Sequence, residues 1–220
     1  MRGTGGARRI GFAFENAARK KGFRSIAGVD EAGRGCLAGP VVAAAVILDP
    51  RRPVHGIDDS KRLRPEARER VAKRIRERAL AFSVAAVGNE LIDRGNILRA
   101  TLDAMRRAAE SLDPRADFLL IDGISAPRSR IPAACVVRGD ARSFSIAAAS
   151  ILAKVERDRM MAEFDREFPG YGFAAHKGYP TPEHRDALRR LGPCTIHRLT
   201  FRGVQPEEAV PRAQRLLPMG

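Results

Sequence analysis

Four acidic residues stand at or just beyond the ends of short apolar segments of this sequence. Asp30 and Glu31 follow one such segment, and two further apolar segments run up to Asp122 and Asp140. Apolar segments of this length are typical of buried strands, and open α/β sheets place their ligands in a crevice outside the strand ends. The sequence therefore predicts that the four carboxyl groups converge on one cleft.

The two later aspartates also have a plainer interpretation. Asp122 precedes Gly123 and Asp140 follows Gly139, and pairs of this kind are common in turns. The adjacent acidic pair is harder to explain in this way, because ionised carboxylates beside an apolar segment repel each other unless a cation or a proton relieves them. The pair therefore predicts a divalent metal ion, and oxygen ligands favour Mg²⁺ or Mn²⁺ over zinc.

A glycine-containing turn follows the acidic pair. Adjacent residues of a regular strand point to opposite faces, so Asp30 and Glu31 can serve one site only if the strand ends there. Gly33 and Gly35 allow that ending, because glycine accepts backbone angles and close approaches that other residues resist. The turn, centred on Arg34, exposes main-chain N–H groups that can hold a phosphate or a ribose hydroxyl. A simple hairpin turn is the alternative, and the glycine spacing disfavours a dinucleotide-binding loop.

The balance of charge is strongly basic. The 220-residue chain has a formal net charge of +14, and only six of its 40 basic residues are lysines. A basic surface attracts polyanions, and the planar guanidinium group of arginine suits phosphate. Together with the acidic cluster, this charge favours metal-dependent phosphoryl chemistry, in which paired metal ions stabilise the attacking and the leaving oxygen.

Several other classes of protein are disfavoured. No apolar run approaches the roughly 20 residues that a bilayer span needs. The basic amino-terminal segment lacks the apolar core of a secretory signal, so we expect a cytoplasmic protein. The three cysteines, Cys36, Cys135 and Cys194, share no short spacing, and we expect reduced thiols rather than a disulfide framework or a zinc site.

Strand and helix patterns are mixed along the chain, which predicts an α/β protein with a central sheet. Apolar segments predict strands at residues 26–30, 41–48, 83–87, 118–121 and 134–137. Apolar periodicity and capping residues predict helices at residues 65–82, 97–112, 144–168 and 182–191.

The organisation into domains is simple. We expect one catalytic domain over residues 14–203. A flexible basic leader, residues 1–13, precedes it, and a tail interrupted by prolines, residues 204–220, follows it.

Six segments of the sequence resemble those of bacterial ribonuclease HII enzymes and occur in the order of that family. They are Gly28-Val-Asp-Glu-Ala-Gly-Arg-Gly-Cys-Leu-Ala-Gly-Pro40, Asp59-Ser-Lys61, Leu120-Ile-Asp-Gly123, Arg138-Gly-Asp140, Ala147-Ala-Ala-Ser-Ile-Leu-Ala-Lys154 and His176-Lys-Gly-Tyr-Pro-Thr181. The resemblance implies an RNase H-like fold, a mixed five-stranded sheet flanked by helices, with a C-terminal helical portion. It also implies an endonuclease that hydrolyses the RNA strand of RNA-DNA hybrids and cleaves at single ribonucleotides in duplex DNA. The expected products carry a 3′-hydroxyl and a 5′-phosphate.

The resemblance also implies roles for individual residues. The family's catalytic and metal-binding carboxylates, for Mn²⁺ or Mg²⁺, match Asp30, Glu31, Asp122 and Asp140. The family's substrate-binding residues match the Gly33, Arg34 and Gly35 turn, Lys61 as a phosphate contact and Tyr179 as the residue that packs against the sugar. Two positions depart from the family's usual residues, Cys36 for proline and Arg138 for lysine, and neither removes a ligand.

The expected partners are RNA-DNA hybrids and DNA duplexes that contain ribonucleotides, with no membrane and a monomeric protein. Two other classes stay open as alternatives. An inactive metal-binding adaptor would bind a hybrid in Mn²⁺ without cleaving it. A metal-dependent nucleotide enzyme would bind free nucleotides, although the sequence offers no P-loop lysine-serine pair for them.

Overall fold

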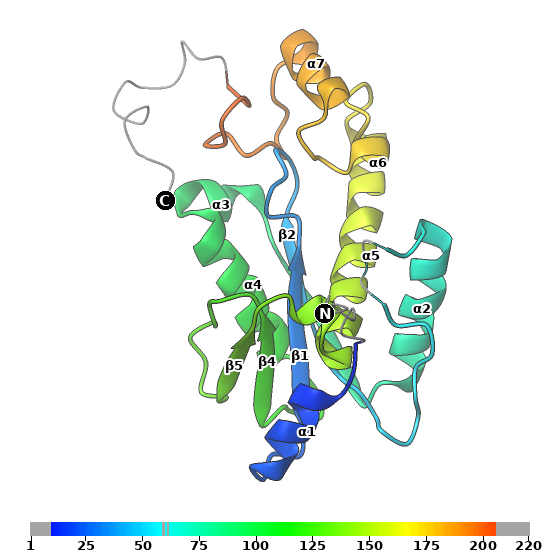
Figure 1. Ribbon diagram of the computed structural model, residues 1–220. Helices are drawn as coiled ribbons and strands as arrows, with labels where there is room; N and C mark the ends of the chain where they lie inside the picture. Colours follow the sequence, from blue (N-terminus) through cyan, green and yellow to red (C-terminus); the bar gives the residue numbers. More distant parts are fainter. Residues whose placement is uncertain (1–9, 59, 61, 206–220) are drawn as a thin grey trace, which may run out of the picture.

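The computed structural model describes residues 10–58, 60 and 62–205. Its five strands form one sheet in the order β3-β2-β1-β4-β5 (Figure 1). The strands are β1 (Ile26–Ala32), β2 (Val41–Ile47), β3 (Ala81–Val87), β4 (Phe118–Asp122) and β5 (Ala133–Val136). β1 pairs antiparallel with β2 and parallel with β4, while β2–β3 is antiparallel and β4–β5 is parallel. The predicted mixed five-stranded sheet is confirmed.

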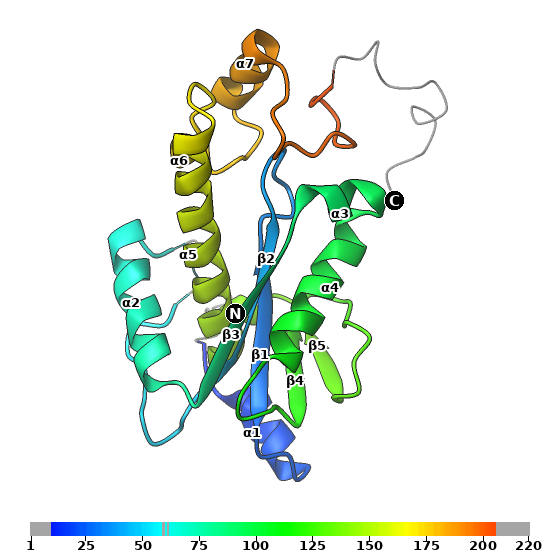
Figure 2. The same cartoon turned by 180° about the vertical axis from the view of Figure 1, so that it is seen from behind.

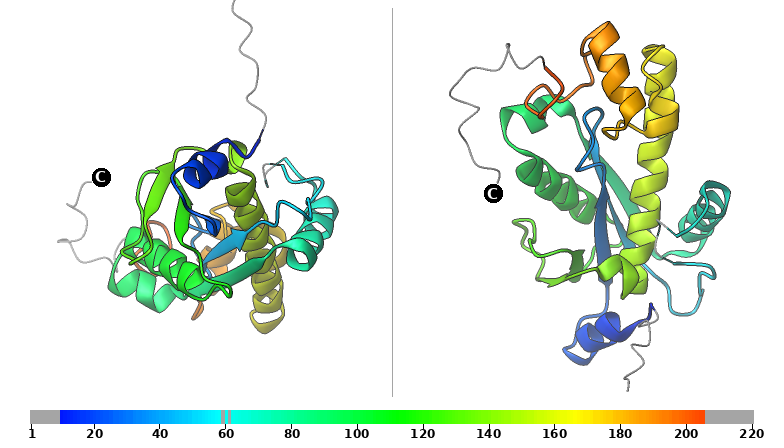
Figure 3. Two further views of the ribbon diagram at one scale, coloured as in Figure 1. Left: turned by 90° about the horizontal axis from the view of Figure 1, so that it is seen from below. Right: turned by 45° about the horizontal axis from the view of Figure 1, so that its top comes forward.

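Helices cover both faces of this sheet. They are α1 (Ala13–Lys20), α2 (Pro65–Arg78), α3 (Asn89–Arg94), α4 (Ile97–Glu110), the 3-10 turn η1 (Gly139–Ala141), α5 (Phe144–Glu167), α6 (Phe173–His176) and α7 (Pro182–Leu191). Figures 2 and 3 show α4 on one side of the sheet and α5 with α2 on the other. Alternation along β2 explains both layers, because Ala43 and Ala45 belong to the core under α4 whereas Ala44 and Val46 belong to the core under α2 and α5.

Helix α5 lies unusually close to β1. A Cβ atom added at Gly28 would lie 2.1 Å from the carbonyl carbon of Ser145, so only glycine fits there. The first turns of α5 meet the sheet with Ala147, Ala148 and Ala149, which are all fully buried. Small residues on both elements therefore let the α5 backbone approach the strand that carries the acidic pair.

The structure corrects two predicted boundaries. The strand expected to end at Asp30 continues through Glu31 to Ala32, because these residues still pair with β2, so the acidic pair lies inside β1. The helix expected to run from Pro65 to Phe82 ends at Arg78. Phe82 lies in β3, which begins at Ala81. The apolar spacing of the helix continues beyond its end because Phe82 belongs to β3, which pairs with β2 along its whole length, with Ala81 opposite Ile47. The short helices α1, α3 and α6 were not among the predicted elements.

The ends of the described chain contact the domain. Gly11 forms a parallel bridge with Ser143, and the ring of Phe12 lies 4.8 Å from that of Phe144. These residues belong to the leader expected at 1–13, most of which lies outside the described residues. Val204 is buried beside Leu37, and residues 206–220 of the expected tail are likewise outside the described range. Among the described residues, no helix is long and apolar enough to cross a membrane.

Candidate active site

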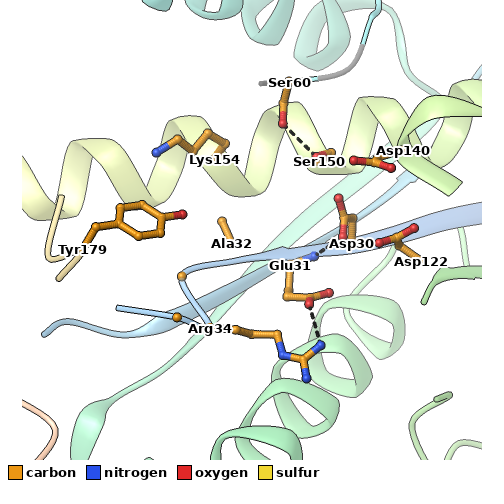
Figure 4. A pocket seen from close by; sticks show the side chains of 12 residues that line it. Asp30, Glu31, Ala32, Arg34, Ser60, Asp122, Asp140, Ser150, Lys154 and Tyr179 are labelled. Atoms are coloured by element: carbon orange, nitrogen blue, oxygen red, sulfur yellow. Dashed lines mark hydrogen bonds and ion pairs between the residues drawn. The ribbon is translucent and has the colours of Figure 1, made fainter. Parts of the chain in front are cut away.

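A pocket of about 250 Å³ opens where β1 and β4 end and α5 passes over them. Figure 4 shows the acidic side chains at one end of this pocket and Tyr179 at the other. The predicted site residues that line it are Asp30, Glu31, Gly33, Arg34, Gly35, Asp122, Asp140 and Tyr179. The structure thus brings together every predicted site residue that it describes. Lys61, the remaining one, lies outside the described residues.

Asp30 is the most enclosed acidic group of this pocket. It lies on β1, is 5% exposed, and accepts a 2.7 Å hydrogen bond from the main-chain N–H of Glu31. Burial raises the pKa of Asp30 well above its ordinary value, and the charges of Glu31 and Asp122 raise it further. The hydroxyl of Ser150 stabilises the charged form by a hydrogen bond but does not offset these effects. A cation in the pocket would relieve the repulsion.

The other carboxyl groups are held by different partners. The Glu31 carboxylate accepts a hydrogen bond from the Arg34 guanidinium at 3.2 Å, and Asp122 accepts one from the main-chain N–H of Gly139 at 2.6 Å. Burial raises the pKa of Glu31, and Arg34 lowers it. Within the described residues, no three acidic, histidine or cysteine side chains are already arranged around a common ion position. Arg34 contacts one oxygen of the Glu31 carboxylate, so the other oxygen remains available to an ion.

The turn after β1 combines a tight and an open glycine. Gly33 has φ +96°, and a Cβ atom there would lie 2.0 Å from Nε of Arg157, which is fully buried. A Cβ atom at Gly35 would meet no protein atom within 4 Å. The packing of the protein therefore requires glycine at 33 but not at 35. The open position lies on the pocket, where a ligand could approach the backbone closely.

Tyr179 reaches the pocket from the loop after α6. Its side chain is 41% exposed, and its ring lies 5.7 Å from the Lys154 ammonium group and 5.9 Å from the Arg157 guanidinium group. Gly178 places it there with φ +78°, since a Cβ atom at that residue would lie 2.7 Å from the carbonyl oxygen of Ala38. Spacing along the sequence could not show this proximity, which comes from the fold.

Four further residues line the pocket that the sequence did not single out, namely Ala32, Ser60, Ser150 and Lys154. The Ser60 and Ser150 hydroxyls are 3.0 Å apart, and Lys154 forms a 2.6 Å ion pair with Asp158. Ser150 and Lys154 are four residues apart on α5, so they share one face of the helix. That periodicity, applied to the small-residue segment, could have found both.

Comparison with known proteins gives this arrangement a family. The model of the family described as "Ribonuclease HII" matches the chain over residues 27–204. The chain belongs to the ribonuclease HII family. The ribonuclease HII of Geobacter sulfurreducens is 54% identical over 192 residues, 87% of this chain and 88% of its own length. That of Solibacter usitatus is 50% identical over 208 residues, 94% of this chain and 91% of its own length.

Solved structures of ribonucleases H2 and H3 share the fold. The crystal structure of ribonuclease H2 from Pyrococcus horikoshii OT3 has a TM-score of 0.70 at 25% identity, and the match covers 82% of this chain and 95% of that one. The structure of Bst-RNase HIII in complex with Mn²⁺ has a TM-score of 0.63 at 23% identity, covering 82% and 68%. The predicted RNase H-like fold is thereby confirmed.

Membership of the ribonuclease HII family settles the class of activity. The chain is a hydrolytic endoribonuclease that acts on the RNA strand of RNA-DNA hybrids. The two alternatives, an inactive adaptor and a nucleotide enzyme, are not favoured.

Proposed function

We propose that the pocket between β1, β4 and α5 is the active site and that Asp30, Glu31, Asp122 and Asp140 hold Mn²⁺ or Mg²⁺ in it. The convergence of these four carboxylates on one pocket is the observation that carries this proposal. An all-oxygen donor set fits a hard divalent cation. Burial raises the pKa of Asp30, the charges of Glu31 and Asp122 raise it further, and such an ion would neutralise this negative charge. A bound ion would supply positive charge to the phosphate oxygens during hydrolysis.

We further propose that the enzyme cleaves at single ribonucleotides in duplex DNA, leaving a 3′-hydroxyl and a 5′-phosphate. Reading one ribonucleotide requires contact with its 2′-hydroxyl, the group that DNA lacks. The turn from Gly33 to Gly35 can present main-chain groups to that hydroxyl, and the open space at Gly35 supports a close approach. The half-exposed ring of Tyr179 can pack against the neighbouring sugar.

Other properties of the protein stay predictions. Lys61 is proposed to contact a phosphate of the substrate. A monomer in the cytoplasm is proposed as the working form, and the three free cysteines of the described residues are compatible with a reducing compartment. One similar solved structure is the PCNA:RNase HII complex from Archaeoglobus fulgidus, which is 28% identical with a TM-score of 0.61. The match covers 76% of this chain and 88% of that one, and the PCNA complex is a property of that protein.

Substitution of Tyr179 tests the reading of the sugar. Tyr179→Ala should slow single-turnover cleavage at a lone ribonucleotide by about ten- to a hundredfold, the loss expected when roughly 1 to 3 kcal/mol of positioning is removed. Tyr179→Phe separates ring packing from hydrogen bonding by the hydroxyl. The substrates are a duplex with one ribonucleotide and a continuous RNA-DNA hybrid. Wild-type rates for Tyr179→Ala on both substrates would place this tyrosine outside the site. Mapping the product ends tests the position of cleavage.

A further inference from the structure

Two consecutive residues beyond α7, His197 and Arg198, are completely buried although both carry polar side chains. Neither lines the pocket. Their segment lies against the chain that follows the glycine turn, because Ala38 and His197 form an antiparallel bridge and the N–H of Arg198 donates to Leu37 at 2.9 Å. These two residues therefore lie directly behind the part of the site proposed to contact the sugar, formed by the Gly33–Gly35 turn and Tyr179.

The guanidinium group of Arg198 holds the turn by its main-chain carbonyl oxygens. It donates to Gly33 at 2.7 Å, to Arg34 at 2.9 Å and to Gly39 at 2.9 and 3.0 Å. The C=O and the following N–H of a planar trans peptide point in opposite directions. Carbonyls 33 and 34 face Arg198, so the N–H groups of Arg34 and Gly35 are directed away from it.

Arginine suits this task better than any other side chain. Its planar fork can serve several acceptors at once, whereas a lysine ammonium group offers a point charge on a flexible stem. Burial lowers the pKa of Arg198 to about 10, which leaves it charged at neutral pH. The charge is therefore available to strengthen all of these hydrogen bonds.

His197 reaches the other sugar-reading element through a second histidine. The Nδ1 atom of His184 lies 2.9 Å from the carbonyl oxygen of Tyr179, and its Nε2 atom lies 3.0 Å from Nε2 of His197. A carbonyl only accepts, so His184 Nδ1 carries a proton and donates it, and His184 Nε2 accepts from His197. This series of hydrogen bonds ends at Cys194, whose N–H donates to Nδ1 of His197 at 2.9 Å.

This hydrogen-bond chain requires both imidazoles to be neutral. Burial lowers the pKa of His197 to about 4, with the nearby His184 adding to the effect, and burial likewise lowers the pKa of His184. His176 stacks on His184 with ring centroids 4.3 Å apart, and its carbonyl accepts from the Tyr179 N–H at 2.9 Å. The backbone of Tyr179 is therefore held by both its N–H and its C=O.

We propose that His197 and Arg198 are positioning residues of the active site, Arg198 orienting the Gly33–Gly35 turn and His197, through His184, orienting Tyr179. This inference rests on the proposed function, which assigns the reading of the sugar to the turn and to Tyr179. Because the two positioning residues are adjacent in the chain, they also set the turn and the tyrosine relative to each other.

Substitutions of His184 test the histidine half of this proposal. His184→Leu removes the side-chain donor to the Tyr179 carbonyl and leaves the main-chain N–H of Thr181, which donates to it at 2.8 Å. The side-chain amide of His184→Asn can restore the lost hydrogen bond from nearly the position of Nδ1. We expect His184→Leu to slow single-turnover cleavage at a lone ribonucleotide about tenfold and His184→Asn to recover most of the loss. In a Tyr179→Ala background, His184→Leu should have little further effect, because coupled residues are not additive.

Binding measurements test the arginine half. In EDTA, the wild-type protein should bind a duplex with one ribonucleotide more tightly than an all-DNA duplex. Arg198→Lys should abolish that preference while leaving affinity for the all-DNA duplex within about twofold, since general phosphate contacts are untouched. The control is Arg52→Lys, in which an exposed guanidinium that donates to the Glu77 carbonyl is lost far from the pocket. Its preference and rate should equal those of the wild type.

The outcomes separate this inference from the function on which it rests. Wild-type cleavage by Tyr179→Ala would remove the proposed role of the tyrosine itself. Slow cleavage by Tyr179→Ala with wild-type cleavage by His184→Leu would overturn the histidine relay alone. A uniform loss of affinity for both duplexes in Arg198→Lys, in step with a lower melting temperature, would make Arg198 merely structural. Failure of Arg198→Lys to fold would likewise make Arg198 merely structural and overturn the arginine half, while the His184→Leu and His184→Asn pair decides the histidine half.

Discussion

At the scale of single residues, the buried carboxyl group of Asp30 links the electrostatics of the pocket to its chemistry. Burial and the nearby charges of Glu31 and Asp122 raise its pKa. A carboxyl group with a folded-state pKa above its unfolded value binds protons more tightly in the folded protein. It therefore weakens the fold increasingly as pH rises from its unfolded pKa of about 4, and the penalty is complete only once pH has risen through the higher folded-state pKa.

A stability measurement on Asp30→Asn follows from this sign. In EDTA at pH 7 the variant should melt at a higher temperature than the wild type, because a neutral amide replaces a repelled charge. Saturating Mn²⁺ should raise the melting temperature of the wild type by mass action and that of Asp30→Asn by less. A metal-free variant that is less stable than the wild type, or equal gains from Mn²⁺, would mean that the charge cluster is misread.

The sequence predicted the site residues unevenly, for physical reasons. The carboxylates could be inferred because they lie near the carboxyl ends of neighbouring strands, which meet in space. Asp122 ends β4, Asp30 and Glu31 precede the last residue of β1, and Asp140 lies in the turn after β5. Tyr179 came only from the resemblance, since nothing local places a loop tyrosine at the end of a distant strand. Arg157 and Arg198 could not be inferred, because a buried arginine with main-chain partners looks like a surface arginine until the fold encloses it.

At the scale of elements, the approach of α5 to β1 sets the geometry of the pocket. Continuous apolar segments predicted the strands well, because a strand buried on both faces, as β2 is, has an unbroken apolar run. Helix α5 was predicted almost to the residue by its unbroken helical composition, which ends before Pro169. The short helices α3 and α6 were not predicted because four to six residues are too few to establish a helical period.

Two glycine substitutions separate packing from ligand approach. Gly28→Ala places its methyl group against the α5 backbone, which cannot move aside, and should destabilise the protein by about 1 to 3 kcal/mol or more. Gly35→Ala meets no protein atom, so its stability should match that of the wild type while cleavage at a lone ribonucleotide falls. Denaturant unfolding and single-turnover cleavage, measured on both variants, check this contrast. Equal destabilisation of the two, or full activity of Gly35→Ala, would contradict it.

At the scale of the whole molecule, the net charge of +14 governs encounter with the substrate. A protein that neutralises phosphates releases condensed counterions, so the logarithm of its affinity for a duplex should fall roughly linearly with the logarithm of salt concentration. Fluorescence anisotropy at salt concentrations from about 50 to about 200 mM measures this slope. Lys61→Ala should flatten it by about one phosphate contact. Weaker binding with an unchanged slope would place Lys61 away from the backbone.

In the proposed function, the acidic pocket cleaves the RNA strand with the help of a divalent cation. Single-turnover cleavage of an RNA-DNA hybrid, with Mn²⁺ and with EDTA, tests it most directly when the wild type is compared with Asp30→Asn and with Asp103→Asn. Asp103 is the matched control, because its carboxylate pairs with Arg106 on α4, away from the pocket. We expect cleavage in Mn²⁺ by the wild type and Asp103→Asn, a loss of cleavage by Asp30→Asn, and no cleavage by any of them in EDTA. Cleavage by the wild type in EDTA, or an Asp30→Asn enzyme as fast as Asp103→Asn, would contradict it.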